Sequence, residues 1–155
     1  MIAVTPGNNV QYDEFKFKVF LAGTIDNGDS TNWQKEVIDK LDEDLVIFNP
    51  RRDNWKKDAT QQDLEEQIKW EQEHLEEADL IIMYLADNSK SPISLLELGL
   101  YGKNNKMIVF CTDNFYRYTN IRLTCERYNI LLMNTNDIEG VIESIKIIYN
   151  KYYKK

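Results

Sequence analysis

The stretch Asp79-Leu80-Ile81-Ile82-Met83-Tyr84-Leu85 is apolar from its second residue to its last. A half-exposed strand alternates apolar and polar residues, whereas a strand inside a parallel sheet is buried on both faces and reads as a continuous apolar run. The charged segment 61–78, which has no Gly or Pro, precedes this run, and Ser91-Pro92 follows it as a typical helix start. These residues therefore predict a strand between two helices, the repeating unit of an α/β sheet.

The same alternation continues on both sides of this unit. A mixed, Tyr-rich stretch before residue 130 stands where one further helix belongs. We therefore expect an α/β protein with a flavodoxin-like open five-stranded parallel sheet, strand order 2-1-3-4-5, and helices on both faces. Apolar runs and helical spacing predict the other strands at 17–23, 45–48, 106–111 and 130–133, and helices at 31–41 and 137–149.

Length and charge limit the classes of partner. The chain has 155 residues and a net charge of −7, from 19 Lys and Arg against 26 Asp and Glu. We expect a single domain over 1–155, with 1–16 as an N-terminal extension and 150–155 as a frayed basic tail. A negative field repels phosphate backbones and anionic lipid, so neither a nucleic acid polymer nor a membrane is an expected partner.

The cysteines and the N-terminus point to the cytoplasm. Cys111 and Cys125 are too few and too far apart for a disulfide framework, and we interpret them as free core thiols. The opening residues 1–7 have no basic segment followed by an apolar one, as a cleaved signal would. The single histidine, His74, has no Cys or His neighbour at ligand spacing, so we expect neither a metal nor a cofactor.

One acidic residue interrupts the apolar stripe of the helix predicted at 61–78. Steps of three or four residues from Leu64 reach Ile68, Glu71, Leu75 and Ala78. This phase directs Glu71 toward the core. The alternative is a different helix rotation, which would leave Glu71 in solvent.

The helix that starts at Ser91-Pro92 has the inverse pattern. It is apolar almost all round, and its only polar stripe is Ser94, Glu97 and Tyr101. A carboxylate among leucines is costly to bury unless it is paired or lies in a cleft, so Glu97 is a candidate site residue; the alternative is a stripe that faces solvent. Two inward carboxylates from different helices are the arrangement of an enzyme that cleaves glycosidic bonds.

Four motifs together resemble the nucleoside 2-deoxyribosyltransferase family, in its 2-deoxyribosyltransferase-like branch. They are Val19-Phe20-Leu21-Ala22-Gly23-Thr24-Ile25, Phe48-Asn49-Pro50-Arg51-Arg52, the segment from Trp70-Glu71 to Ala78-Asp79, and Ser91-Pro92-Ile93-Ser94-Leu95-Leu96-Glu97-Leu98-Gly99. The resemblance implies a flavodoxin-like fold, homo-oligomers, and cleavage or transfer at the N-glycosidic bond of a 2'-deoxynucleoside or its 5'-monophosphate. The small-molecule partner would be that nucleoside or nucleotide.

The resemblance also implies roles for the two carboxylates. Glu97 matches the family's nucleophile, which forms an ester at C1', and Glu71 matches its general acid, at a position where the family usually has Asp. Val19 or Phe20 replaces a family tyrosine that hydrogen-bonds the nucleophile, and Tyr101 is a candidate for part of that role.

The remaining candidates would bind substrate. Ser91 matches the nucleotide hydrolases of the family, which place Ser near the 5'-phosphate, whereas Asp26 stands where those hydrolases tend to have Arg, so nucleoside and monophosphate both remain open. A binding module that senses a nucleotide without cleaving it is the alternative function. The full set of substrate-binding candidates is Gly23, Thr24, Asp26, Asn49, Pro50, Arg51, Ser91, Ser94 and Tyr101.

Overall fold

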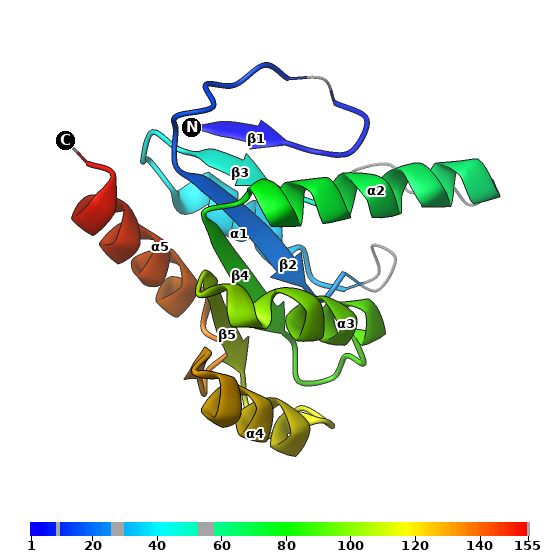
Figure 1. The fold of residues 1–155 in the computed structure, drawn as a ribbon, viewed down its shortest axis with the longest axis vertical. Coiled ribbons are helices and arrows are strands. Elements are labelled where there is room, and N and C mark those ends of the chain that lie inside the picture. The colour runs from blue at the N-terminus through cyan, green and yellow to red at the C-terminus, as the bar shows by residue number, and fades with distance from the viewer. Residues whose placement is uncertain (9, 26–29, 53–57, 155) are drawn as a thin grey trace.

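The computed structural model describes residues 1–8, 10–25, 30–52 and 58–154. Strands and helices alternate along these residues (Figure 1). The strands are β1 (Ile2–Val4), β2 (Lys18–Gly23), β3 (Val46–Phe48), β4 (Leu80–Leu85), β5 (Met107–Cys111) and β6 (Leu131–Met133). The helices are α1 (Trp33–Lys40), α2 (Gln61–Glu77), α3 (Pro92–Tyr101), α4 (Tyr118–Tyr128) and α5 (Ile138–Tyr152), with a 3-10 turn at Gly102–Asn104.

All strand pairs are parallel, in the order β1-β3-β2-β4-β5-β6. Without β1, this is the predicted order 2-1-3-4-5, so the flavodoxin-like α/β architecture is confirmed. The winding reverses between β2 and β4, which are neighbours in the sheet although β3 lies between them in the chain. Ligands of such sheets bind beyond the carboxyl ends of the strands at this point.

The predicted number of strands is wrong by one. The N-terminal extension contributes β1, which pairs with β3 and places Ile2 opposite Val46. Backbone hydrogen bonds from Ile2 N to the Leu45 carbonyl (3.0 Å) and from Asn49 N to the Val4 carbonyl (2.9 Å) hold it there. Three residues carry too little local pattern to predict a strand, and β1 forms because β3 offers an open edge.

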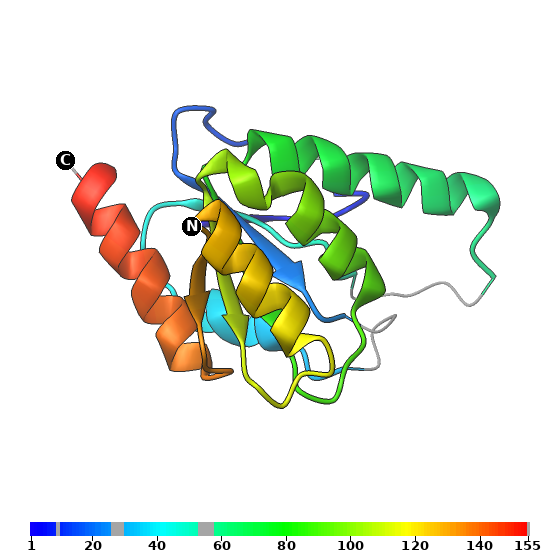
Figure 2. The same ribbon diagram turned by 60° about the horizontal axis from the view of Figure 1, so that its bottom comes forward.

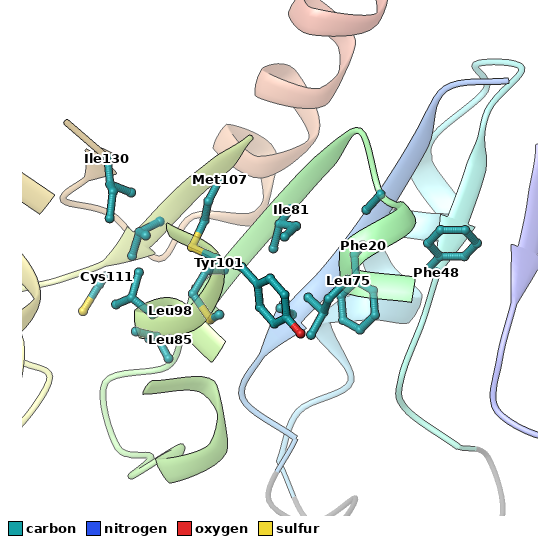
Figure 3. Packing of buried hydrophobic residues seen from close by; sticks show 14 of the residues in the cluster. Phe20, Phe48, Leu75, Ile81, Leu85, Leu98, Tyr101, Met107, Cys111 and Ile130 are labelled. Atoms are coloured by element: carbon teal, nitrogen blue, oxygen red, sulfur yellow. The ribbon is translucent and has the colours of Figure 1, made fainter. Parts of the chain in front are cut away.

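The helices cover both faces of the sheet. Helices α1 and α5 pack on one face, and α2, α3 and α4 on the other (Figures 1 and 2). Each face has its own hydrophobic cluster, because successive side chains of a strand point to opposite faces. Figure 3 shows the cluster under α2 and α3, where Phe20 and Ile81 of the sheet meet Leu75, Leu98 and Tyr101 of the helices.

Helix α2 is only partly covered. It begins with a capping box in which Thr60 and Asp63 bind each other's backbone N–H groups. Its N-terminal half extends beyond the sheet (Figures 1 and 2), and the apolar stripe is exposed there: Leu64 is 51% and Ile68 41% exposed, whereas Leu75 is buried. The predicted core face therefore holds only toward the C-terminal end of α2.

The C-terminus also differs from the expected frayed tail. Helix α5 continues to Tyr152, and the ring of Tyr153 stacks on Phe17 with centroids 4.2 Å apart. Aromatic packing thus holds a segment whose lysines alone suggested fraying. Within the described residues, no helix combines the length and the apolar character needed to cross a membrane.

Candidate active site

Glu71 lies on α2 and is half-buried. One helical turn earlier, Gln67 donates its side-chain amide to Glu71 Oε1 at 2.7 Å and to the Pro50 carbonyl at 3.1 Å. Arg52 Nε donates in turn to Gln67 Oε1. The inward phase predicted from periodicity is therefore the observed one, and a hydrogen-bond network links Glu71 to the segment after β3.

Glu97 lies on the polar stripe of α3, and this stripe faces inward. Ser94 and Tyr101 are buried and Glu97 is half-buried, whereas Leu96 and Leu100 on the same helix are more than half exposed. The apolar composition of α3 therefore does not mean that the helix is buried almost all round. Ile93, Leu96 and Leu100 face away from the sheet, whereas the polar stripe and Leu98 face the protein.

The two carboxyl groups lie close enough to influence each other. Burial raises the pKa of Glu97 to about 8, and the charge of Glu71 adds to the increase. Burial also raises the pKa of Glu71, while the hydrogen bond from Gln67 and the charge of Arg52 lower it. The protonated form of Glu97 is therefore favoured below about pH 8, and the two carboxyl groups titrate as an interacting pair.

Three buried hydroxyl groups meet where β2 ends and α3 begins. Thr24 Oγ1 lies 2.8 Å from Ser91 Oγ and 2.9 Å from Ser89 Oγ, and it accepts a hydrogen bond from Ala86 N. Ser91 has a left-handed backbone (φ 46°), and its side chain does not cap α3. This cluster joins the segments that follow β2 and β4 at the reversal point of the sheet, and its Ser91 lies six residues before Glu97.

Other substrate-binding candidates have structural tasks. A Cβ on Gly23 (φ +130°) would lie 1.9 Å from the Tyr84 carbonyl oxygen, so close strand packing requires this glycine. Asn49 Oδ1 accepts from Arg51 N, and Pro50 supplies the carbonyl that Gln67 binds. The Arg51 guanidinium donates to the carbonyls of Ser30 and Thr31, and therefore holds the segment before α1.

Tyr101 is the predicted site residue that follows Glu97 on α3. Tyr101 lies in the core cluster one turn after Glu97 (Figure 3), and burial together with the charges of Glu76 and Glu97 raises its pKa. Asp26 lies outside the described residues. Of the two residues expected to replace the family tyrosine, Phe20 lies on the sheet face under α2 and α3, and Val19 on the opposite face.

Sequence reasoning missed Gln67 and Ser89. Gln67 precedes Glu71 by four residues, a spacing at which Gln and an acid can hydrogen-bond on a helix, so the signal was present. Ser89 had no comparable signal, because its contact with Thr24 joins segments 65 residues apart.

A cavity of about 370 Å³ opens beside Thr24. Thr24, Trp33 and Tyr84 line it together with Ile138, on the side of the sheet covered by α1 and α5. Neither Glu71 nor Glu97 is among its described lining residues. Across the described part of the chain, no cluster of three or more His, Cys, Asp or Glu could hold a metal ion.

Comparison with known proteins identifies the family of this chain. A search of curated proteins finds no significant match. The family model described as "Nucleoside 2-deoxyribosyltransferase like" matches residues 16–115, which is well over half of the chain. The matched region runs from just before β2 to just after β5 and includes both carboxylates and the hydroxyl cluster. The chain therefore belongs to the nucleoside 2-deoxyribosyltransferase-like family.

Proposed function

We propose that this protein cleaves or transfers at the N-glycosidic bond of a 2'-deoxynucleoside or its 5'-monophosphate, with Glu97 as nucleophile and Glu71 as general acid. The observation that carries the proposal is the half-buried carboxyl pair, in which burial and, after it, the charge of Glu71 raise the pKa of Glu97. Family membership supports the same class of substrate. No cofactor is needed, because nucleophile and acid are both side chains of this chain.

The reaction balances with the single proton of the pair. Because Glu97 favours its protonated form below about pH 8, the reactive form is the one in which Glu97 has lost its proton while Glu71 carries one. A Glu97 oxygen bonds to C1' while the bond from C1' to the base nitrogen breaks, and that nitrogen takes the proton of Glu71. Water or a second base then attacks C1', the ester bond to Glu97 breaks, and the Glu71 carboxylate accepts the proton of the attacking group.

The substrate-binding role belongs to the groups at the carboxyl ends of β2 and β4. Thr24 and Ser91 supply hydroxyl groups for a sugar or a phosphate, beside the first turn of α3. Free backbone N–H groups and the helix dipole favour an anion at such a position. The remaining candidates, Gly23, Asp26, Asn49, Pro50, Arg51, Ser94 and Tyr101, would shape the site around these two.

We further propose that the protein acts as a homo-oligomer in the cytoplasm. The exposed apolar side of α3, formed by Ile93, Leu96 and Leu100, supports the oligomer, because a second copy would remove this surface from water. The free thiols of Cys111 and Cys125 support the location. The excess of acidic residues argues against partners with phosphate backbones or anionic lipid surfaces.

A nucleotide-binding module without catalysis is the second candidate function. One observation favours it: Phe20, on the sheet face under α2 and α3, has no hydroxyl group with which to bind Glu97. If the family tyrosine is essential, this chain would keep its ligand intact.

The test is base release from a panel of deoxynucleosides and their 5'-monophosphates, followed by chromatography with and without a second base. We expect release by the wild type and at least a roughly 10³-fold loss in Glu97→Gln, since removal of a nucleophile costs that much or more. Glu73→Gln, on the exposed side of α2, is the matched control. The proposal fails if the wild type releases no base, or if Glu97→Gln releases as much. Calorimetric binding of a ligand that stays intact would identify the binding module.

A further inference from the structure

Gln67 uses both ends of its side-chain amide within the candidate active site. Its Nε2 donates to Glu71 Oε1 and to the Pro50 carbonyl, and its Oε1 accepts from Arg52 Nε. A carboxylate and a carbonyl only accept hydrogen bonds, and a guanidinium only donates them. The amide of Gln67 therefore has one possible orientation, with Nε2 toward the two acceptors and Oε1 toward the guanidinium. In this orientation it joins the segment after β3 to the carboxyl group on α2.

This contact leaves the two oxygens of Glu71 in different situations. Oε1 accepts from Gln67 at 2.7 Å, whereas no described residue hydrogen-bonds Oε2. When Glu71 carries a proton, an Oε1 already engaged by an N–H donor is the poorer position for it, because donor and proton would face each other. The proton therefore belongs on Oε2.

We propose that Gln67 is a positioning residue, which holds Glu71 by Oε1, is itself anchored by Arg52, and so presents Oε2 as the atom that transfers the proton. This inference rests on the proposed function, because it assigns the proton of the general acid to one oxygen. It also explains how a Glu can stand where the family usually has Asp: the longer side chain is held against its own helix.

Electrostatics point the same way. The groups that act on Glu71 are Gln67 on its own helix and Arg52 from the segment after β3, and Glu71 in turn acts on Glu97 of α3. The Gln67 hydrogen bond and the Arg52 charge both lower the pKa of Glu71, against the effect of burial. Loss of Gln67 would therefore make Glu71 hold its proton at higher pH. It would also leave the Glu71 side chain less firmly positioned.

The test compares Gln67→Leu with Gln62→Leu. Gln62 forms the same contact on the exposed side of α2, from its Nε2 to Glu66 Oε1 at 3.2 Å, and is the matched control. For Gln67→Leu we expect kcat to fall about 10- to 100-fold with KM changed less than about threefold, as when a catalytic group is misplaced. The acid limb of the kcat/KM profile, which reports the first proton lost by the pair, moves to higher pH. Gln62→Leu should match the wild type.

Gln67→Glu separates donation to Glu71 from contact with Arg52. A carboxylate at position 67 can still accept from Arg52, but it cannot donate to Glu71, so we expect the same loss of kcat as in Gln67→Leu. The inference is wrong if Gln67→Glu keeps wild-type kcat, or if Gln67→Leu lowers only the urea midpoint while the folded enzyme keeps its kcat and its acid limb.

A measurement independent of catalysis keeps this inference apart from the proposed function. Carboxyl ¹³C NMR follows the titration of Glu71 in the wild type, in Gln67→Leu and in Gln67→Glu. The midpoint should rise in both variants and stay unchanged in Gln62→Leu; an unchanged midpoint in Gln67→Leu overturns the inference. An inactive wild type would overturn the proposed function, and this titration would still decide whether Gln67 controls Glu71.

Discussion

Glu97 holds its proton in the folded protein over a pH range in which the unfolded chain has lost it. Burial raises its pKa from 4.5 to about 8. Ionisation of Glu97 is unfavourable because of its place on α3, where it shares the inward side with the buried side chains of Ser94, Leu98 and Tyr101. Such a group links stability to pH whether or not the protein is an enzyme.

We predict that stability falls as pH rises from 4.5 to about 8, because the folded chain binds a proton that the unfolded chain releases. One such group contributes a slope of up to about 1.4 kcal/mol per pH unit. In Glu97→Gln the slope should be smaller by this amount, which urea unfolding at several pH values would measure. Glu73→Gln should keep the slope of the wild type, and an unchanged slope in Glu97→Gln would contradict a buried, protonated Glu97.

Gln34 is a second residue with an unfavourable environment. It is fully buried on α1, and among the described residues neither its side-chain nitrogen nor its oxygen has a hydrogen-bond partner. A buried amide without partners costs about 1–3 kcal/mol.

We therefore predict that Gln34→Met raises the free energy of unfolding by about 1 kcal/mol or more, because Met has a similar shape and no amide to desolvate. Urea unfolding with unchanged m-value would show it. Gln72→Met, at an exposed position of α2, should change the free energy of unfolding by less than about 0.5 kcal/mol. A destabilised Gln34→Met would mean that the amide is satisfied, for example by an ordered water.

At the scale of elements, the central strands and the edge strand β6 could be predicted, whereas the edge strand β1 could not. Strands β2, β4 and β5 are buried on both faces, so each is a continuous apolar run that can be recognised locally. Strand β1 depends on the edge of β3, and helix α4 is amphipathic only in part, with Ile121 and Cys125 as its buried residues. Such elements are stabilised by partners distant in the chain, which local periodicity does not contain.

Two glycines illustrate how the same residue serves different elements. We predict that Gly23→Ala destabilises the protein by more than about 3 kcal/mol, because its Cβ would overlap the Tyr84 backbone and its φ is +130°. Gly99→Ala should instead stabilise α3 by about 0.5–1 kcal/mol, since, apart from its chain neighbours and its own helix backbone, no atom of the described residues lies within 4 Å of the added Cβ. Thermal unfolding of both variants measures the contrast, and similar melting temperatures would contradict the close packing of β2 and β4.

For the molecule as a whole, α3 is the element with the most unusual exposure. Ile93, Leu96 and Leu100 are 59%, 57% and 55% exposed, while the polar stripe of the same helix faces inward. The polar site thus occupies the side of α3 that would otherwise be core. The proposed homo-oligomer would cover the apolar side left outside.

We predict that Leu96→Glu lowers the assembly state, because a charge placed in an apolar interface loses its hydration. Sedimentation equilibrium of the wild type should give a multiple of the chain mass of 18.3 kDa, and the variant should approach a single chain. Ile147→Glu, 56% exposed on α5 across the sheet, is the matched control and should assemble as the wild type does. A wild type that sediments as a single chain would exclude this role for α3.

The sequence by itself determined the alternation of strands and helices, the buried central strands and the spacing that directs Glu71 and Glu97 inward, because apolar periodicity and helical spacing are local properties. Only the tertiary structure decided that β1 joins the sheet, that Gln67 and Arg52 hold Glu71, and that Thr24 meets Ser89 and Ser91. The physical reason is the same in each case. These contacts join segments that are distant in the chain or side chains with several possible partners, and packing alone selects among them.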